Sequence, residues 1–395
     1  MASLEDPISN DIPLCRLTES HRPMNDPPSV PGPSSPPQLC VSRLIPALPD
    51  DLSILCIARV PRSHHHFLAA VSRAWRTFLC SPLLFSLRLE VGSFQHFLLL
   101  KIETTPDQSR WYLLDRLRRN PSPPLIPLPE PPLPSIFGYA AVTLGHSLFL
   151  LGGSINDKPS PAVQIYDARF NIWRLGAPML ASRVFATAGA IANRIYTFGG
   201  CLNIYESWAE EFNLERGWRR IPSPPMIREK WMHGNAVIGG KLLAVADRGG
   251  VVLDLAVASA ETEEAQLKAW GTVPATLDFG WRGKMVAVGD VLYSYDFRGK
   301  IRGYDLVKEE WKTVKGVDKE LPKFSYGATL SNFGEMLCLV WEGRGRSEGM
   351  EIFCAGIRVT VTNSGQLQGS VEWLETIDLA IPKGSSIVHC ISVEF

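Results

Sequence analysis

The sequence has no excess of charge of either sign and no long apolar run. Lys and Arg number 40, Asp and Glu number 40, in 395 residues. This balance gives no argument for a nucleic-acid or anionic-membrane partner. The longest apolar runs, such as Phe97–Leu100, are too short to span a bilayer, and the N-terminus lacks the basic and apolar regions of a secretory signal. We therefore expect an intracellular protein, cytoplasmic or nuclear, without nucleic-acid or membrane partners.

The sequence also lacks the cysteine and histidine spacings of metal sites. No Cys-x-x-Cys pair occurs, and most cysteines lie inside apolar runs, which is typical of free buried thiols in a reducing compartment. Adjacent histidines, His64-His65-His66, point in different directions on a helix and do not form a chelating face. We expect a solvated helix start there, and neither a metal nor a cofactor.

Familiar catalytic patterns are absent as well. No Gly-x-Ser-x-Gly, His-Glu-x-x-His or Walker motif occurs. The Gly-rich stretch 343–349 lacks the following helix that a phosphate cradle needs. Three adjacent glutamate pairs are expected on solvated faces rather than as acid/base pairs: Glu210-Glu211, Glu263-Glu264 and Glu309-Glu310. The sequence thus favours a non-catalytic protein.

What the sequence does contain is a repeat. An apolar run follows a short turn at five positions, Leu148, Ile195, Leu242, Leu292 and Leu337, with spacings of 47, 47, 50 and 45 residues. Each turn follows another apolar run, so each unit predicts a β-hairpin. A period near 45 to 50 residues is typical of propeller blades.

In four units, a second strand pair is marked by Tyr, Phe or Leu directly before an Asp or Asn, with a Trp further along the chain. The marks are Tyr166-Asp167 with Trp173, Phe212-Asn213 with Trp218, Leu253-Asp254 with Trp270, and Tyr304-Asp305 with Trp311. Together with the Gly-Gly after the first apolar run, this arrangement resembles the kelch motif. The third and fourth units depart from it in part.

The ends of the repeat region predict how the ring closes. Leu98 lies 50 residues before Leu148, which indicates a further blade that lacks an opening strand. Residues 387–393 resemble an opening strand with no blade to open. Donating that strand to the first blade would remove two exposed sheet edges. We predict an all-β propeller of six blades closed by the C-terminal strand.

The N-terminal region has a different pattern. Residues 1–42 are rich in Pro, Ser, Asn and Asp and predict a disordered tail, a spacer or a Pro-rich ligand. Residues 43–89 show helical periodicity: Pro49-Asp50-Asp51 opens one helix, Ser63 can cap a second, and Ser81-Pro82 interrupts a third. Three short helices carry more apolar residues than they can bury, which favours a partner.

This helical region resembles the F-box. The resemblance rests on Leu-Pro-Asp-Asp-Leu at 48–52, Ala-Arg-Val-Pro at 58–61, Val-Ser-Arg-Ala-Trp-Arg at 71–76 and Ser-Pro-Leu at 81–83. An F-box before kelch repeats, here residues 90–395, is similar to the large plant F-box/kelch family of Skp-interacting proteins. The resemblance implies docking on a Skp-type adaptor, and through it a cullin, by Leu48, Pro49, Leu52, Ile57, Val71, Trp75 and Leu79.

The same resemblance implies a substrate receptor of a Skp-cullin-F-box ubiquitin ligase whose propeller holds an unknown target protein. Arginines recur in connecting loops and could form a basic rim suited to carboxylates or phosphates: Arg183, Arg228, Arg248, Arg282, Arg298 and Arg344. They could equally bond neighbouring carbonyls. Two other classes stay open, a non-catalytic scaffold that binds the adaptor, and a propeller enzyme whose ligand set cannot be placed.

Overall fold

The protein consists of two compact units that divide between Gln95 and His96. The computed structural model describes residues 44–395 except 106–107, 117–124, 134–136, 202–206, 229, 231, 247–248, 261, 282, 297, 323–327, 345–349 and 383. The expected N-terminal tail lies outside these residues. In the described part, no helix is both long and apolar enough to cross a membrane.

The first unit is helical, as expected, but has one helix more than the sequence analysis predicted. Its helices are α1 (Asp50–Ala58), α2 (His65–Val71), α3 (Arg73–Leu79) and α4 (Pro82–Glu90), with a 3-10 turn at Arg62–His64. Ser81-Pro82 starts α4 rather than only ending α3: the Ser81 hydroxyl accepts from Leu84 N and Pro82 occupies the first turn. The prediction that Ser63 caps the second helix was wrong, because α2 begins after the 3-10 turn without a side-chain cap.

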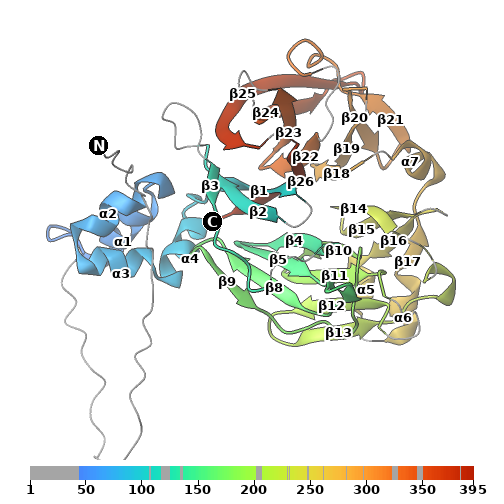
Figure 1. Ribbon diagram of the computed structural model, residues 1–395, viewed down its shortest axis with the longest axis horizontal. Helices are drawn as coiled ribbons and strands as arrows, with labels where there is room; N and C mark the ends of the chain where they lie inside the picture. Colours follow the sequence, from blue (N-terminus) through green and yellow to red (C-terminus); the bar gives the residue numbers. More distant parts are fainter. Residues whose placement is uncertain are drawn as a thin grey trace, which may run out of the picture. The chain divides into compact units, whose positions relative to one another are not determined.

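The second unit is a six-bladed β-propeller, and each blade is a four-stranded antiparallel sheet. Figure 1 shows the blades following one another around a ring. The first blade contains β26 (Ser386–Glu394), β1 (His96–Thr105), β2 (Gln108–Leu114) and β3 (Leu125–Pro127). The second contains β4 (Ala140–Leu144), β5 (Ser147–Leu151), β8 (Val163–Asp167) and β9 (Ile172–Leu175). The third contains β10 (Thr187–Ile191), β11 (Arg194–Phe198), β12 (Ala209–Asn213) and β13 (Gly217–Ile221).

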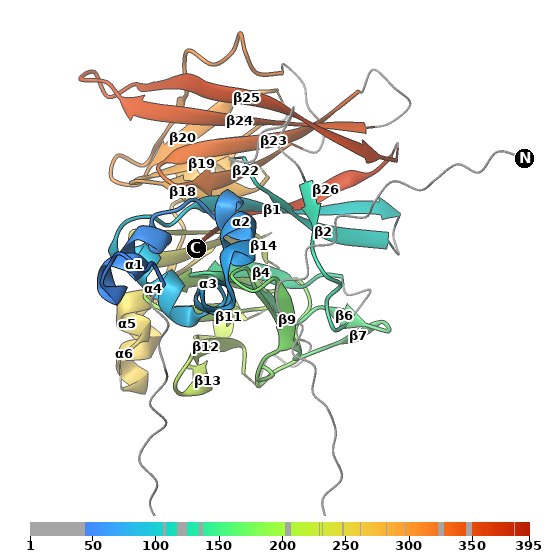
Figure 2. The ribbon, with the colours of Figure 1, turned by 90° about the vertical axis from the view of Figure 1, so that its left-hand side faces the viewer.

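The other three blades follow in chain order. The fourth blade contains β14 (Met232–Ile238), β15 (Lys241–Ala246), β16 (Val251–Asp254) and β17 (Trp270–Thr272). The fifth contains β18 (Met285–Val288), β19 (Val291–Tyr295), β20 (Ile301–Asp305) and β21 (Glu310–Thr313). The sixth contains β22 (Thr329–Phe333), β23 (Met336–Arg344), β24 (Met350–Val361) and β25 (Leu367–Ile381). Strands β24 and β25 are the longest, and Figure 2 shows them extending side by side in the sixth blade.

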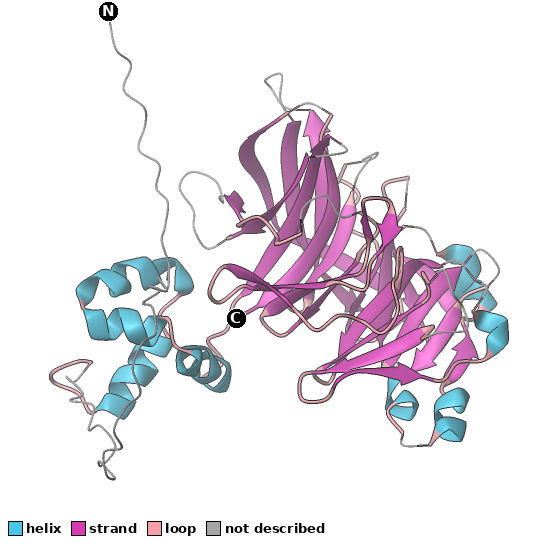
Figure 3. Cartoon of the chain, turned by 60° about the horizontal axis from the view of Figure 1, so that its bottom comes forward, coloured by secondary structure: helices cyan, strands magenta, loops and turns pink. Residues whose placement is uncertain are grey.

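The insertions between strands are small. A hairpin of β6 (Ser154–Ile155) and β7 (Lys158–Pro159) lies between β5 and β8. Helices α5 (Leu255–Ala258) and α6 (Glu263–Lys268) join β16 to β17, and α7 (Ala275–Gly280) and a 3-10 turn (Pro225–Ile227) lie in connections between blades. Figure 3 shows these short helices beyond the ends of the strands.

The closure of the ring is confirmed. β26, from the C-terminus, pairs antiparallel with β1 from His96↔Glu394 to Glu103↔Ser386. It therefore supplies the opening strand that the first blade lacks. The opening strands β26, β4, β10, β14, β18 and β22 contact their neighbours all the way around the ring. The first blade therefore has the same four-stranded sheet as the other five.

The tryptophan marks of the repeat link successive blades. Each Trp lies in the fourth strand, opposite the residue before the Asp or Asn, as in Tyr166↔Trp173 and Tyr304↔Trp311. Each indole N–H donates to a backbone carbonyl just beyond the fourth strand of the preceding blade. The bonds are Trp173 to Pro129 O (2.8 Å), Trp218 to Ala177 O (2.9 Å), Trp270 to Pro222 O (2.8 Å) and Trp311 to Thr276 O (2.9 Å).

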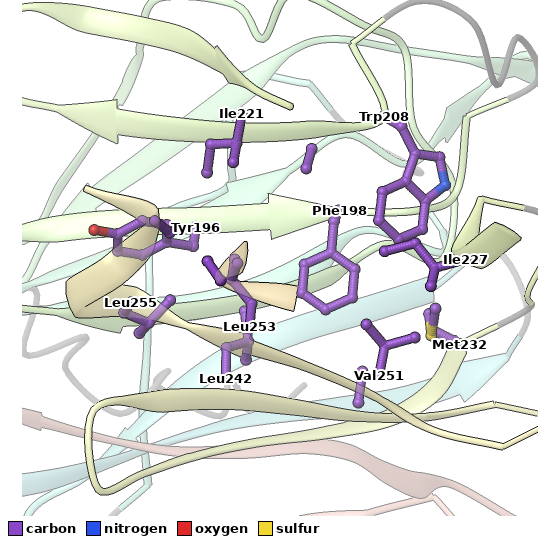
Figure 4. Packing of buried hydrophobic residues seen from close by; sticks show 14 of the residues in the cluster. Tyr196, Phe198, Trp208, Ile221, Ile227, Met232, Leu242, Val251, Leu253 and Leu255 are labelled. Atoms are coloured by element: carbon purple, nitrogen blue, oxygen red, sulfur yellow. The ribbon is translucent and has the colours of Figure 1, made fainter. Parts of the chain in front are cut away.

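Apolar side chains fill the space between blades. Figure 4 shows the contact between the third and fourth blades, where Phe198 and Trp208 pack against residues such as Leu242, Val251 and Leu253. Phe198 and Trp208 stack with ring centroids 5.4 Å apart. Burial on both sides explains why these strands read as continuous apolar runs in the sequence.

Candidate protein-binding surfaces

Helix α1 separates the residues expected to bind an adaptor from those that build the helical unit. Ser53 and Ile57, four residues apart, are buried, with Ile57 only 2% exposed. Leu52 and Cys56, also four residues apart, lie on the other face and are exposed. This is the expected behaviour of i, i+4 pairs on a helix. Leu52, unlike Ile57, is therefore free to contact a partner.

The other predicted adaptor residues divide in the same way. Pro49 and Val71 are exposed, Leu48 and Trp75 are half-buried, and Leu79 is buried. The Trp75 indole N–H donates to Leu44 O at 2.5 Å. Trp75 and Val71 line a pocket of about 470 Å³ with residues 44–46 and 72–74. Ile57 and Leu79 belong to the core of the unit, so any effect of theirs on a partner would act through the fold.

A buried arginine connects α4 to the end of α1. Arg88 of α4 is 1% exposed, and its guanidinium donates to Ala58 O (2.9 Å) and Val60 O (2.7 Å) at the end of α1. It also bonds Ser93 O and the Gln95 side chain. Around this core, large apolar side chains of the helices stay exposed: Leu52, Phe67, Val71, Leu83 and Leu89. Such a concentration on a small unit favours a protein partner.

In the propeller, the strand directions gather certain loops at one end, which we call the loop face. The second and fourth strands of an antiparallel blade run in the same direction and end at the same edge. The loop face therefore carries the loops from second to third strands and the connections from one blade to the next. All six predicted arginines fall in or beside such loops.

The structure places these arginines differently from one another. Arg298 is exposed in the turn after β19. Arg228 is half-buried, and its guanidinium bonds Ser223 Oγ (3.1 Å) and Ser223 O (2.5 Å), which is the alternative of bonding a neighbouring carbonyl. Arg248, Arg282 and the side chain of Arg344 lie outside the described part of the structure.

Arg183 does not belong to an exposed rim, contrary to expectation. Its side chain is 0% exposed and its guanidinium lies 2.6 Å from Glu210 Oε1, which is equally buried. It also donates to Gly199 O (2.7 Å), Trp208 O (2.8 Å) and Ser207 O. Arg183 thus ties the connection between the second and third blades to strands of the third blade.

The expectation of a solvated Glu210-Glu211 pair was wrong for the same reason. Glu210 also accepts from the N–H groups of Leu180 (2.7 Å) and Ala181 (3.0 Å). Glu211 is 2% exposed and pairs with Arg194 (2.5 Å) and Arg219 (2.8 Å). The two side chains point to opposite faces of β12, so Glu210 pairs with Arg183 on one face and Glu211 pairs with Arg194 and Arg219 on the other. For Glu264, which pairs with Lys268 in the open, the expected solvated position is confirmed.

Sequence reasoning missed a set of exposed apolar residues on the loop face. They lie in connections between blades: Phe137, Leu180, Phe185, Met226 and Phe279. Phe137 and Phe185, from successive connections, lie with ring centroids 6.4 Å apart. The available signal was their position, because they are large apolar residues in loops rather than in strands.

Phe185 is also held in an unfavourable backbone conformation. Its φ of 56° is rare for an aromatic residue, and its N–H donates to Gly138 O at 2.6 Å. Yet the side chain is 52% exposed and gains little burial in return. Strain that the surrounding structure maintains at an exposed side chain is typical of binding sites.

Comparisons with known proteins agree with this arrangement. The family model described as "FKB95, Kelch-repeats domain" matches residues 104–377, and the F-box domain model matches residues 45–87. This chain belongs to the plant F-box/kelch-repeat family. It is 28% identical to F-box/kelch-repeat protein At4g29370 of Arabidopsis thaliana over 90% of this chain and 94% of that protein. It is 26% identical to F-box/kelch-repeat protein At4g39550 of the same plant, over 88% and 93%.

The histidines of the F-box fit a structural role. His64 and His66 are exposed, as expected for a solvated helix start. His65 is half-buried with Nε2 3.1 Å from Val60 O, and burial lowers its pKa to about 4, so its ring is neutral near pH 7. Across the described ranges of this F-box/kelch-repeat protein, no three His, Cys, Asp or Glu side chains gather as a metal site would require.

Proposed function

We propose that this chain is the substrate-recognition subunit of a Skp-cullin-F-box ubiquitin ligase. Its F-box binds a Skp-type adaptor, and its propeller binds the protein to be ubiquitinated. The observation that carries the proposal is the set of exposed apolar side chains on α1 and α2, Leu52, Phe67 and Val71, in a chain whose other unit is a closed kelch propeller. The chain then contributes orientation and effective concentration rather than covalent chemistry.

A negative charge at an exposed apolar residue of α1 or α2 should weaken adaptor binding. Leu52→Asp and Val71→Asp place a carboxylate where the proposal puts an apolar contact, at side chains 50% and 62% exposed. Because both positions are already open to water, the fold should persist. We expect each change to weaken binding of a purified Skp-type adaptor at least about tenfold, or about 1.4 kcal/mol, in a surface plasmon resonance assay.

The matched control is Val307→Asp, an equally apolar-to-acidic change at a residue 93% exposed in the propeller. It should leave adaptor affinity unchanged. Equal adaptor affinity for wild type, Leu52→Asp and Val71→Asp would exclude these two residues from the docking surface. Ubiquitin transfer in a reconstituted assay then separates a productive receptor from the alternative, a scaffold that binds the adaptor without ubiquitination.

Target binding should depend on the two phenylalanines of the loop face. Phe185→Asn removes an exposed aromatic ring and supplies a residue that tolerates positive φ. We therefore expect a melting temperature that is unchanged or higher, together with loss of the target proteins co-captured when the proteasome is blocked. Adaptor recovery should stay at the wild-type level.

The control for this pair of readouts is Val307→Asn. Val307 lies in the turn between the third and fourth strands of the fifth blade, at the end opposite the loop face. This variant should keep every co-captured target. If Phe185→Asn retained the same targets at the same yield, the aromatic pair would have no part in recognition.

A further inference from the structure

A pocket of about 440 Å³ lies on the loop face between the first and second blades. Its floor comes from the hairpin of β1 and β2, its far wall from β5 and β8, and its rim from the connection that follows β3. A volume of this size is typical of small-molecule sites. Its walls are mixed, with the apolar side chains of Ile102, Trp111, Leu133 and Leu150 beside a few polar groups.

A buried lysine lines this pocket without an acidic partner. Lys101 is 8% exposed, and its ammonium lies 4.5 Å from the centroid of the Tyr139 ring. Within the described residues, Lys101 makes this cation–π contact, and no acceptor lies within hydrogen-bond distance of its Nζ. Burial lowers the pKa of Lys101, while the charge of Glu103 acts in the opposite direction. A lysine held this way is costly to the fold unless an anion can approach it.

A second polar group beside Lys101 is also unsatisfied. The Tyr139 hydroxyl is buried, and within the described part of the chain no acceptor lies within hydrogen-bond distance of its O–H. Burial raises the pKa of this phenol, and a hydrogen bond with the Trp111 side chain, which can only donate, offsets part of that rise, so the group stays a neutral O–H donor. Among the described residues, the Lys101 ammonium and the Tyr139 hydroxyl therefore both lack an acceptor.

Stacked rings hold these two groups in place. Lys101 lies between His389 and Trp111 in the register of the first blade. His389 stacks with Trp111 (5.7 Å) and with Tyr139 (5.4 Å). Burial and the charges of Lys284 and Lys101 lower the pKa of His389 to about 3, so it adds no positive charge at neutral pH. The pocket therefore contains one buried cation, Lys101, and the exposed Arg110 is also among its lining residues.

We propose that this pocket binds a small organic carboxylate with a flat apolar body. The carboxylate would accept from Lys101 Nζ and the Tyr139 hydroxyl, and the body would lie against Trp111 and the apolar wall. The one buried cation, Lys101, has Glu103 close to it, and the exposed Arg110 and Glu130 among the lining residues offset each other, so the pocket suits one negative charge better than a phosphate dianion. Binding here is independent of what the F-box binds.

The test is isothermal titration calorimetry of the full chain with three aromatic carboxylates: benzoate, phenylacetate and 3-phenylpropionate. We expect saturable binding of at least one, at least tenfold tighter than its neutral amide, and no competition by inorganic phosphate. Lys101→Met keeps the length of the side chain and removes the buried charge, so it should fold. It should bring the affinity for the carboxylate down to that for the amide, and Tyr139→Phe should weaken the carboxylate several-fold.

Lys241→Met, at the exposed lysine that begins β15, is the matched control and should bind like wild type. Melting curves of each variant establish that the propeller is folded. Failure of all three carboxylates to bind, phosphate binding as tightly as they do, or full carboxylate affinity in Lys101→Met would each overturn the proposal.

Discussion

Arg183→Met should destabilise the propeller by about 3–5 kcal/mol, the usual result of removing one partner of a buried ion pair. The change leaves the Glu210 carboxylate fully buried, with only the N–H groups of Leu180 and Ala181 to stabilise its charge. It also removes one donor from each of the carbonyls of Gly199 and Trp208, although Trp208 O still accepts from the N–H of Gly199. Urea unfolding followed by tryptophan fluorescence measures the loss.

Two variants show whether the buried charge is the cause. Arg228→Met removes the arginine of the next connection, which is half-buried and whose guanidinium bonds Ser223 Oγ and Ser223 O; it should cost less than Arg183→Met, because its side chain is not fully buried. The double variant Arg183→Met/Glu210→Gln removes the stranded charge and should recover part of the lost stability. An Arg183→Met protein as stable as Arg228→Met would show that the Arg183–Glu210 pair does not hold this connection to the third blade.

The repeat could be predicted because each blade uses the same physical solution. Tyr166-Asp167 with Trp173 and Tyr304-Asp305 with Trp311 place a strand, a turn and a Trp strand at equal offsets, and the structure pairs them in register. The indole N–H bonds between blades give each Trp a reason to recur. Local pattern and tertiary contact agree here, so sequence alone was sufficient.

Burial of charged residues could not be predicted in the same way. Arg183 and Arg228 both lie in connections between blades, but Arg183 is fully buried beside the equally buried Glu210, whereas Arg228 is half-buried. Alternation along β12 sends Glu210 and Glu211 to opposite faces, and only the packing of blades determines which faces are closed to water. The sequence shows that successive side chains of a strand point to opposite faces, but it does not show which face a neighbouring blade covers.

The candidate binding surfaces were predicted in part. The spacing of Leu52 and Ile57 on α1 does not say which of them faces inward, because both are apolar; the neighbouring helices decide it. Phe137 and Phe185 fit no strand pattern and were passed over, although apolar residues outside the pattern are those a fold does not need for its core. Lys101 directly follows the apolar run Phe97–Leu100 in the sequence, and only its contact with Tyr139, 38 residues later, marks it as unusual.

Removing β26 should abolish the folded propeller. Deletion of residues 386–395 takes away the whole ladder with β1 and four buried side chains: Ile387, Cys390, Val393 and Phe395. At about 1.5–3 kcal/mol each, their burial amounts to roughly 6–12 kcal/mol, comparable to the total stability of a typical domain. The truncated chain should show no cooperative melting transition and should aggregate, because β1 then presents a free inner edge.

Two proline substitutions and a peptide test whether strand pairing is the cause. Ser386→Pro changes only the first residue of β26, a position where proline is tolerated, and should melt close to wild type. Ile391→Pro lies opposite Leu99 in the middle of the ladder and should melt like the deletion. A synthetic peptide of residues 384–395 added to the truncated chain should restore part of the transition, because the missing strand enters as a separate segment. Unchanged melting of the truncated protein would mean that five blades and an open sheet are enough, and that β26 closes the ring without holding it.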